Sequence, residues 1–220
     1  MPSRPPLRPD RIIAAAIAVA DRDGLTGVSM RSVGRELGVE AMSLYHHIAD
    51  KDALLDGLAD RIMAMIELPR QDRPWRPAMA ERAASARAVL SAHPWALGLI
   101  ESRRTPGPSL LRHHDAVLGN LRDNGFSVAL AAHAFSAIDA YVYGFVLTET
   151  SLPFAQDEDA GDFVEHLGEL LDAAQYPHLF EQLREQVVDR DYDYGDEFDD
   201  GLDLILDGLE RRLRSIGEQP

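Results

Sequence analysis

The sequence of 220 residues contains no cysteine and a single lysine, Lys51. The absence of cysteine excludes disulfide bonds and thiolate chemistry. Glycine-rich phosphate loops and the Gly-x-Ser-x-Gly signature of serine hydrolases are also missing. No uninterrupted apolar run approaches the ~18 residues of a membrane span, and the Pro- and Arg-rich stretch at 1–10 lacks the apolar core of a secretory signal. The missing catalytic signatures argue against an enzyme. The missing membrane span and secretory signal lead us to expect a cytoplasmic protein with no membrane partner.

Positive charge is scarce, and the excess of acidic residues lies late in the chain. The formal net charge is −15. Residues 156–200 carry sixteen acidic side chains against Arg184 and Arg190, a net charge of −14, whereas residues 1–47 carry six arginines against five acidic residues. The N-terminal part is therefore close to neutral and could approach DNA phosphates if its arginines share one face. The acidic stretch is typical of a solvated surface.

Apolar residues follow helical spacing almost everywhere, and strand-like alternation is rare, so we predict an all-α fold. The first helix is expected to begin near Pro9 and to end at Gly24. Ser29 is a good N-cap for a second helix over 30–37, and a third is predicted over 41–48. Further helices are predicted at 51–67 and 78–92, and a short one follows Pro94 and runs through Ile100. The remaining helices are predicted around 110–121, at 127–150, at 163–174 and from about 196.

Two short helices on either side of Gly38 form the most informative pattern, within residues 28–47. Apolar Val33, Leu37 and Leu44 can hold this pair at a steep angle against the first helix. The second short helix then protrudes, and the major groove of DNA is wide enough to accept it. A plain helical corner is the alternative interpretation. One tyrosine and two histidines on so short a helix favour a DNA-binding function, because a stable core needs none of them.

Residues off the apolar stripe are expected to face the DNA. Ser43 and Tyr45 carry hydroxyls that can reach phosphates or base edges, and Met42 can pack on a thymine methyl group. Lys51 stands at a helix start, where backbone N–H groups also favour a phosphate. The predicted DNA-binding residues are Ser29, Arg31, Ala41, Met42, Ser43, Tyr45, His46, His47 and Lys51.

Residues 8–66 resemble the DNA-binding domain of the TetR family of transcriptional regulators. Four segments carry the resemblance: Ile12–Gly24, Gly38–Glu40, Leu44–His47 and Lys51–Asp56. The tyrosine in the recognition helix, followed by a Lys-x-x-Leu-Leu helix start, is fairly specific to that family. The resemblance implies phosphate contacts for Tyr45 and Lys51, and it places Arg31, Ala41, Met42, Ser43 and His46 near bases.

Parts of the chain beyond residue 66 are similar to the tetracycline-repressor subgroup of that family, namely Trp75, His93, Asn124–Ser127 and Leu204–Leu213. The resemblance implies a three-helix helix-turn-helix domain at 1–50 and a larger helical domain for ligand binding and dimerisation at 51–220, linked by helix 51–67. It implies a homodimeric regulator, most simply a repressor, that binds a palindromic double-stranded operator and is released by a small organic effector. The alternative is a helical dimer that binds or sequesters a small molecule without binding DNA.

The predicted effector site lies near His114, Val117, Phe135 and Asp139. Asp139 stands inside an apolar helix, where an acid needs a partner or a ligand, and a satisfied core aspartate is the alternative. The positions that hold the drug- and magnesium-binding side chains in the subgroup carry Glu67, Arg82, Ala86, Ile100 and Val117. Since Ile100 cannot ligate a metal, we expect that a tetracycline–magnesium chelate is not the ligand. No ligand spacing typical of a metal site is present, and no cofactor is expected.

The resemblance also implies that the helices near 127–150 and 196–215 pair across the dimer. The later helix carries Gly201 and Gly208, seven residues apart. Each glycine in a helix interior costs roughly 1 kcal/mol relative to alanine. A close approach of helices at a two-fold axis would justify that cost, and a tight crossing within one chain is the alternative.

Overall fold

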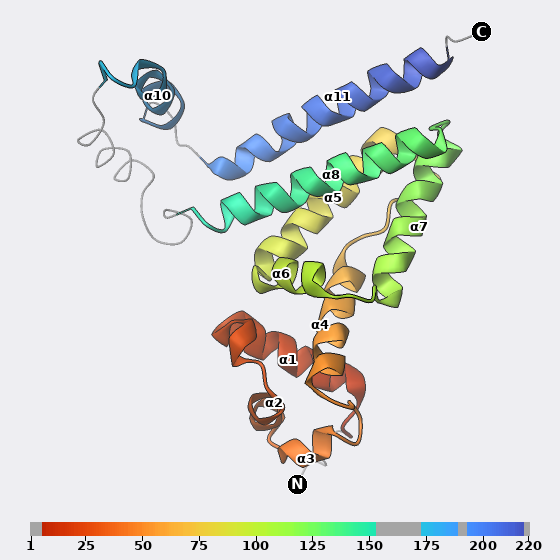
Figure 1. Cartoon of the computed structure of the whole chain (residues 1–220), viewed down its shortest axis with the longest axis vertical. Coiled ribbons are helices and arrows are strands. Elements are labelled where there is room, and N and C mark those ends of the chain that lie inside the picture. The colour runs from red at the N-terminus through yellow and green to blue at the C-terminus, as the bar shows by residue number, and fades with distance from the viewer. Residues whose placement is uncertain (1–5, 153–172, 189–192, 218–220) are drawn as a thin grey trace. The chain divides into compact units, whose positions relative to one another are not determined.

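The computed structural model describes residues 6–152, 173–188 and 193–217 (Figure 1). The described residues form helices and connecting turns without any strand, so the predicted all-α class is confirmed. Contacts divide the chain into two compact units, Met1–Tyr143 and Gly144–Pro220. The helix predicted at 163–174 falls almost entirely outside the described residues.

The first three helices form a small head. Helix α1 (Pro9–Asp23) begins with proline at its first position and ends at Gly24, whose φ of 71° a side chain would oppose. A short 3₁₀ turn, η1 (Leu25–Gly27), leads to α2 (Met30–Leu37) and α3 (Ala41–Leu44). Buried side chains from all three helices make the core of the head, among them Ile12, Val19, Val33 and Leu44.

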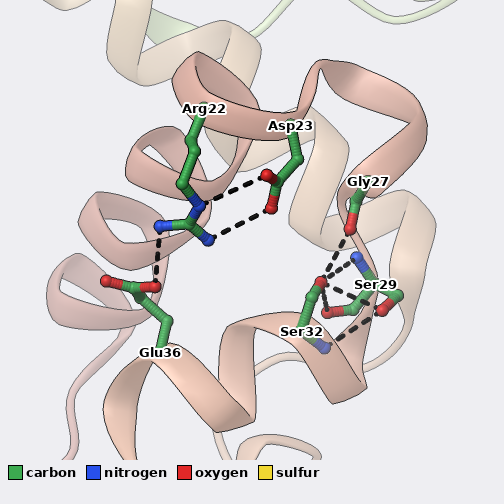
Figure 2. A network of polar contacts seen from close by, with 6 residues as sticks. All are labelled: Arg22, Asp23, Gly27, Ser29, Ser32 and Glu36. Atoms are coloured by element: carbon green, nitrogen blue, oxygen red, sulfur yellow. Dashed lines mark hydrogen bonds and ion pairs between the residues drawn. The ribbon is translucent and has the colours of Figure 1, made fainter.

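Helix α2 has the predicted bounds, with Ser29 as its N-cap residue and Gly38 as its C-cap residue. The Ser29 hydroxyl accepts a hydrogen bond from the Ser32 backbone N–H at 3.1 Å, and the Ser29 N–H donates to the Ser32 hydroxyl at 2.9 Å. Figure 2 shows this capping box beside an ion pair of 3.1 Å that joins Arg22 of α1 to Glu36 of α2. Because that ion pair is exposed and screened by water, it contributes little, and the cap matters more for where α2 begins.

Helix α3 is shorter than predicted. The expectation was a helix over 41–48, but the α-helix ends at Leu44 and the chain continues in turns through His47. The reason is the start of the next helix, since its N-cap Asp50 adopts an extended conformation and accepts from the Ala53 N–H at 2.8 Å. The backbone must leave the helical conformation between these two points.

Helix α4 (Lys51–Met65) belongs to both the head and the helices that follow. It packs against α1 and also against α6 and α7 (Figure 1). Leu54, Leu58 and Ile62 are buried as the apolar stripe predicts. Met65, which the stripe also placed inside, is 42% exposed, and Met63 is buried in its place.

Four further helices follow: α5 (Trp75–Ala92), α6 (Trp95–Ser102), α7 (Pro108–Asp123) and α8 (Val128–Glu149). Helix α5 begins three residues before the predicted start, because Pro77 falls in its first turn, where the missing N–H costs nothing. Asn124 holds the start of α5, because its side-chain oxygen accepts a hydrogen bond from the backbone N–H of Trp75 at 3.2 Å. The Trp75 and Phe126 rings meet edge to face at 5.0 Å.

Among the described helices, α8 alone is long and apolar enough to cross a membrane by composition, with a mean hydropathy of 1.4 over its best window. It is not an uninterrupted apolar run, because His133, Ser136 and Asp139 lie within it. Within that window, 44% of the residues are buried inside the structure, and Asp139 of α8 forms an ion pair with Arg82 of α5. Both features are those of a core helix in a folded domain.

The second unit contains the end of α8, then α10 (Pro177–Gln182), η2 (Leu183–Val188), η3 (Tyr194–Asp196) and α11 (Glu197–Gly217). Phe145 of α8 stacks on Tyr194 at 4.7 Å and meets Phe198 edge to face at 5.0 Å. This aromatic cluster fixes the start of α11 against the end of α8.

Candidate DNA-binding helix and effector site

The segment from α3 to the start of α4 presents most of the predicted DNA-binding side chains to solvent. Met42 is 71% exposed and Tyr45 is 46% exposed, while Leu44 between them is fully buried. His46 and His47 are also exposed, and Ala41 and Ser43 are half-buried. A single buried leucine therefore anchors a short turn that displays an aromatic, a thioether and two imidazole side chains.

Gly34, which sequence reasoning passed over, permits the close approach of α2 and α3. A Cβ atom at this position would lie 3.0 Å from the carbonyl oxygen of Val39 and 3.3 Å from the Cα of Ala41. Such contacts are tighter than side chains normally accept, so a larger residue would push α3 away from α2. The glycine sets the angle at which the α3 segment protrudes.

The remaining predicted DNA contacts lie at helix starts. Arg31, in the first turn of α2, and Lys51, the first residue of α4, are both exposed. Ser29 is different, because its hydroxyl already caps α2. Its role in the fold is visible, and a contact with DNA stays a prediction.

A buried polar cluster joins three helices at the predicted effector site. Arg82 of α5 is 2% exposed, and its guanidinium forms an ion pair with Asp139 of α8. Its Nε–H donates to Nε2 of His113 on α7 at 3.1 Å. Each of these side chains is buried among apolar neighbours, so their polar groups satisfy one another. The aspartate flagged from the sequence thus has an arginine as its partner.

Burial controls the protonation of the groups in and beside this cluster. Burial, and after it the positive charge of Arg82, lowers the pKa of His113 to about 4, so the imidazole is neutral and accepts at Nε2. Burial, followed by the charge of Asp139, raises the pKa of Tyr143 to about 12, which keeps its hydroxyl protonated. The cluster therefore offers hydrogen-bond donors and acceptors with little net charge.

The other predicted effector residues lie beside the cluster on α7 and α8. The rings of His114 and Phe135 meet edge to face at 4.5 Å, and Val117 is fully buried. Arg82 and His113 were missed as site residues. The sequence carries no clear signal for either residue, because α5 also contains Glu81 and Arg87 and its pattern does not show which charge turns inward.

Most of the positions that match the drug-binding residues of the subgroup are buried in this chain. Arg82, Ala86, Ile100 and Val117 are buried, while Glu67 is exposed. Within the described ranges, no group of three or more histidine, aspartate or glutamate side chains is placed to hold a metal ion.

Carboxylates on α4 hold the segment that leads into α7. Asp60 accepts from both the backbone N–H of Ser109, at 2.7 Å, and its hydroxyl, at 3.0 Å. Arg103 donates to Asp56 at 3.2 Å. A Cβ atom at Gly107 would lie 2.4 Å from the Asp60 carboxylate, so only glycine allows the two segments to lie this close. Helix α7, which carries His113 and His114, is thereby tied to the helix that leads to the head.

Comparison with known proteins establishes the family. Residues 12–58 match the family described as bacterial regulatory proteins of the tetR family, and residues 68–213 match the tetracyclin repressor-like C-terminal domain. The HTH-type transcriptional repressor DrrR1 of Streptomyces coeruleorubidus is 35% identical over 216 residues, which cover 94% of this chain and 78% of DrrR1. The class A tetracycline repressor of Escherichia coli is 33% identical, over 94% of this chain and 92% of the repressor.

A solved structure extends the likeness to nearly the whole fold. ActR of Streptomyces coelicolor, crystallised with actinorhodin, superposes with a TM-score of 0.76 at 27% identity, covering 95% of this chain and 99% of ActR. The chain belongs to the TetR family and is a ligand-responsive, DNA-binding transcriptional regulator. Regulators of this family are not enzymes; they bind DNA operators as dimers and respond to small-molecule effectors.

Proposed function

We propose that the protein is a homodimeric repressor that inserts α3 of each protomer into the major groove of a palindromic operator. The observation that supports this most directly is the exposed Met42 and Tyr45 around the buried Leu44. Two such helices across a two-fold axis require half-sites about 34–36 Å apart. Tyr45 and Lys51 would contact phosphates, and His47 and Ser29 would lie at the edge of the DNA interface. The residues near bases would be Arg31, Ala41, Met42, Ser43 and His46.

The proposed dimer interface comprises α8 and α11. Leu147 on α8 and Leu204 on α11 are 61% and 74% exposed, which is costly for a monomer in water. Among the described residues of its own unit, Gly208 has only Arg211 near the position of an added Cβ atom, at 4.0 Å. Because nothing nearby in that unit demands a glycine there, a helix from a second copy is the better explanation than a crossing within one chain.

The effector site is proposed between α5, α7 and α8, beside His114, Val117, Phe135 and Asp139. Aromatic and aliphatic walls with a few convergent polar groups are typical of sites for small organic ligands. The Arg82–Asp139–His113 cluster would supply the polar groups, and a ligand that reaches it must compete with the bonds the cluster already makes. ActR, whose fold is shared, holds actinorhodin, which supports an organic rather than an ionic effector.

The proposed switch runs along α4. Asp60 links it to the start of α7, and α4 also packs against α1 of the head. An effector that shifts α7 would therefore move α4 and disturb the spacing of the two heads. Such an effector must bind the form that is incompetent for DNA more tightly than the competent form. In this scheme residues 1–50 act as the DNA-binding domain, helix 51–67 as the linker and 51–220 as the effector and dimerisation domain, in a cytoplasmic protein.

Selection of DNA sites from a random pool tests this function. The purified protein should recover a palindrome, and a mobility shift with that palindrome should weaken as salt rises, because binding to phosphates releases counterions. A folded dimer that recovers no sequence, or binds without salt dependence, would contradict the proposal and would favour a protein that only sequesters its ligand.

Replacing Tyr45 with alanine should weaken operator binding about tenfold, or ~1.4 kcal/mol, because the hydroxyl and ring no longer contact the backbone of the DNA. Titration of a labelled operator measures the change. Tyr176→Ala is the matched control, because Tyr176 is also 46% exposed but lies just before α10 in the other unit. Equal affinities for wild type and Tyr45→Ala would remove Tyr45 from the interface.

A tetracycline–magnesium chelate should produce no clear thermal shift of this protein. Ile100 stands where a metal-binding side chain is needed, and it is buried with no oxygen or nitrogen to offer. Differential scanning fluorimetry with and without the chelate makes the measurement, with the class A tetracycline repressor as the positive control. A stabilisation of several degrees would show that the altered positions still form a chelate site.

A further inference from the structure

A second connection joins the head to the effector helices, apart from α4. The carboxylate of Asp21, near the end of α1, accepts a hydrogen bond from the indole Nε1–H of Trp95 at 2.7 Å. The same oxygen lies 2.7 Å from Nδ1 of His93. An ionised carboxylate can only accept hydrogen bonds. His93 therefore carries a proton on Nδ1 when it bonds to Asp21. One oxygen of the head thus receives two donors from residues more than seventy positions away.

Both donors are held rigidly at the junction of α5 and α6. His93 is the C-cap of α5, and its N–H donates to the Leu90 carbonyl at 3.2 Å. Trp95 is the first residue of α6, and the Ala96 N–H donates back to the His93 carbonyl at 2.8 Å. The two rings also meet edge to face at 5.9 Å. The side chain of His93 is only 12% exposed, so neither donor has much freedom to turn away.

We propose that Asp21 is a positioning residue that sets the orientation of the DNA-binding head relative to the effector helices. A head carried by α4 alone could rotate about that helix. A second contact on α1, away from the axis of α4, removes this rotation. Two bonds to one charged oxygen are short and directional, so the contact fixes an angle as well as a distance. The inference rests on the proposed function, because the orientation matters only if two heads must match two half-sites.

The prediction concerns tolerance of operator spacing. An operator with one extra base pair at its centre moves the half-sites apart and rotates one about the helix axis, so rigid heads bind it poorly. In Asp21→Ala the heads should adapt, and the ratio of affinity for the selected operator to affinity for the lengthened one should fall about tenfold, within the usual range of coupling between sites. Trp95→Phe, which removes the N–H donor and keeps an aromatic ring, should change the ratio in the same direction.

The control is Asp23→Ala, on the same helix two residues away. Asp23 is paired with its neighbour Arg22 and not with α5 or α6, so the variant should keep the wild-type ratio. If Asp21 merely stabilises the fold, both operators lose affinity by the same factor and the ratio does not change, which overturns the inference. An equal fall in Asp23→Ala overturns it as well.

Failure of the proposed function is visible separately, in the wild-type protein. If wild type binds neither operator in a salt-dependent way, the protein is not an operator-binding regulator of the proposed kind, and the inference falls with it. If wild type discriminates between the operators and Asp21→Ala discriminates equally well, only the inference fails. If Asp21→Ala does not fold, Trp95→Phe provides the test, because it removes one of the two donors to Asp21, and an unchanged ratio in that variant would overturn the inference.

Discussion

Replacing Asp139 with alanine should lower the free energy of unfolding by about 3–5 kcal/mol. The change leaves the guanidinium of Arg82, which is 2% exposed, without the carboxylate that balances its charge. The guanidinium itself has little access to water, and His113 supplies only one neutral acceptor. Urea denaturation followed by circular dichroism measures the loss.

Two variants separate the buried charge from other effects. Asp115→Ala removes an exposed acid from α7 and should change the unfolding free energy by less than about 0.5 kcal/mol. Replacing both partners, as in Arg82→Met with Asp139→Leu, should recover most of the lost stability, since an apolar pair of similar volume has no charge to bury. A loss below about 1 kcal/mol in Asp139→Ala would mean that Arg82 finds another counter-ion.

Acid should destabilise the protein through His113. The pKa of His113 is about 4 in the fold and 6.5 when the side chain is solvated, because burial excludes the charged form. Below the solvated value the unfolded chain binds a proton that the folded chain refuses. The contribution of His113 is therefore fully present above pH 6.5 and is lost as the pH falls toward 4. A shift of this size corresponds to on the order of 3 kcal/mol.

The measurement is urea denaturation of wild type and His113→Gln at about pH 7 and again near pH 4. Many carboxylates titrate in this range, so only the difference between the two proteins reports on His113. We expect the loss in acid to be smaller in His113→Gln, because glutamine has no proton to take up. Equal losses in both proteins would show that His113 is solvated in the fold.

Local chemistry explains why several helices could be predicted closely. Helix α2 runs over the predicted residues because Ser29 and Gly38 end it through bonds made within a few positions. Helix α4 begins after Asp50 for the same reason. The errors lie where a neighbouring element intervened, as at α3, which stops at Leu44 so that the chain can reach Asp50. Met65 was misplaced because the buried face at the end of α4 passes through Met63 and Ile66 instead.

The exposed DNA-binding residues were also predictable, but the effector site was predictable only in part. Leu44 has to be buried if α3 is to pack, so periodicity places Met42 and Tyr45 outside. Asp139 was recognisable as an acid in an apolar helix, but its partner was not. His113 was considered only as a metal ligand and is instead a neutral acceptor for Arg82.

Amino-acid order alone settled the class, the capped helix ends such as those of α2, and most of the buried faces, because caps, glycines and apolar spacing act over three or four residues. Only the packed structure decided which polar groups meet. Arg82 pairs with Asp139 across 57 positions and with His113 across 31, and Trp95 reaches Asp21 across 74. Such pairs depend on how helices cross, and any of several acids or bases would satisfy the local pattern equally well. The low dielectric of the interior then makes the chosen partners matter, because a buried charge without its partner is costly.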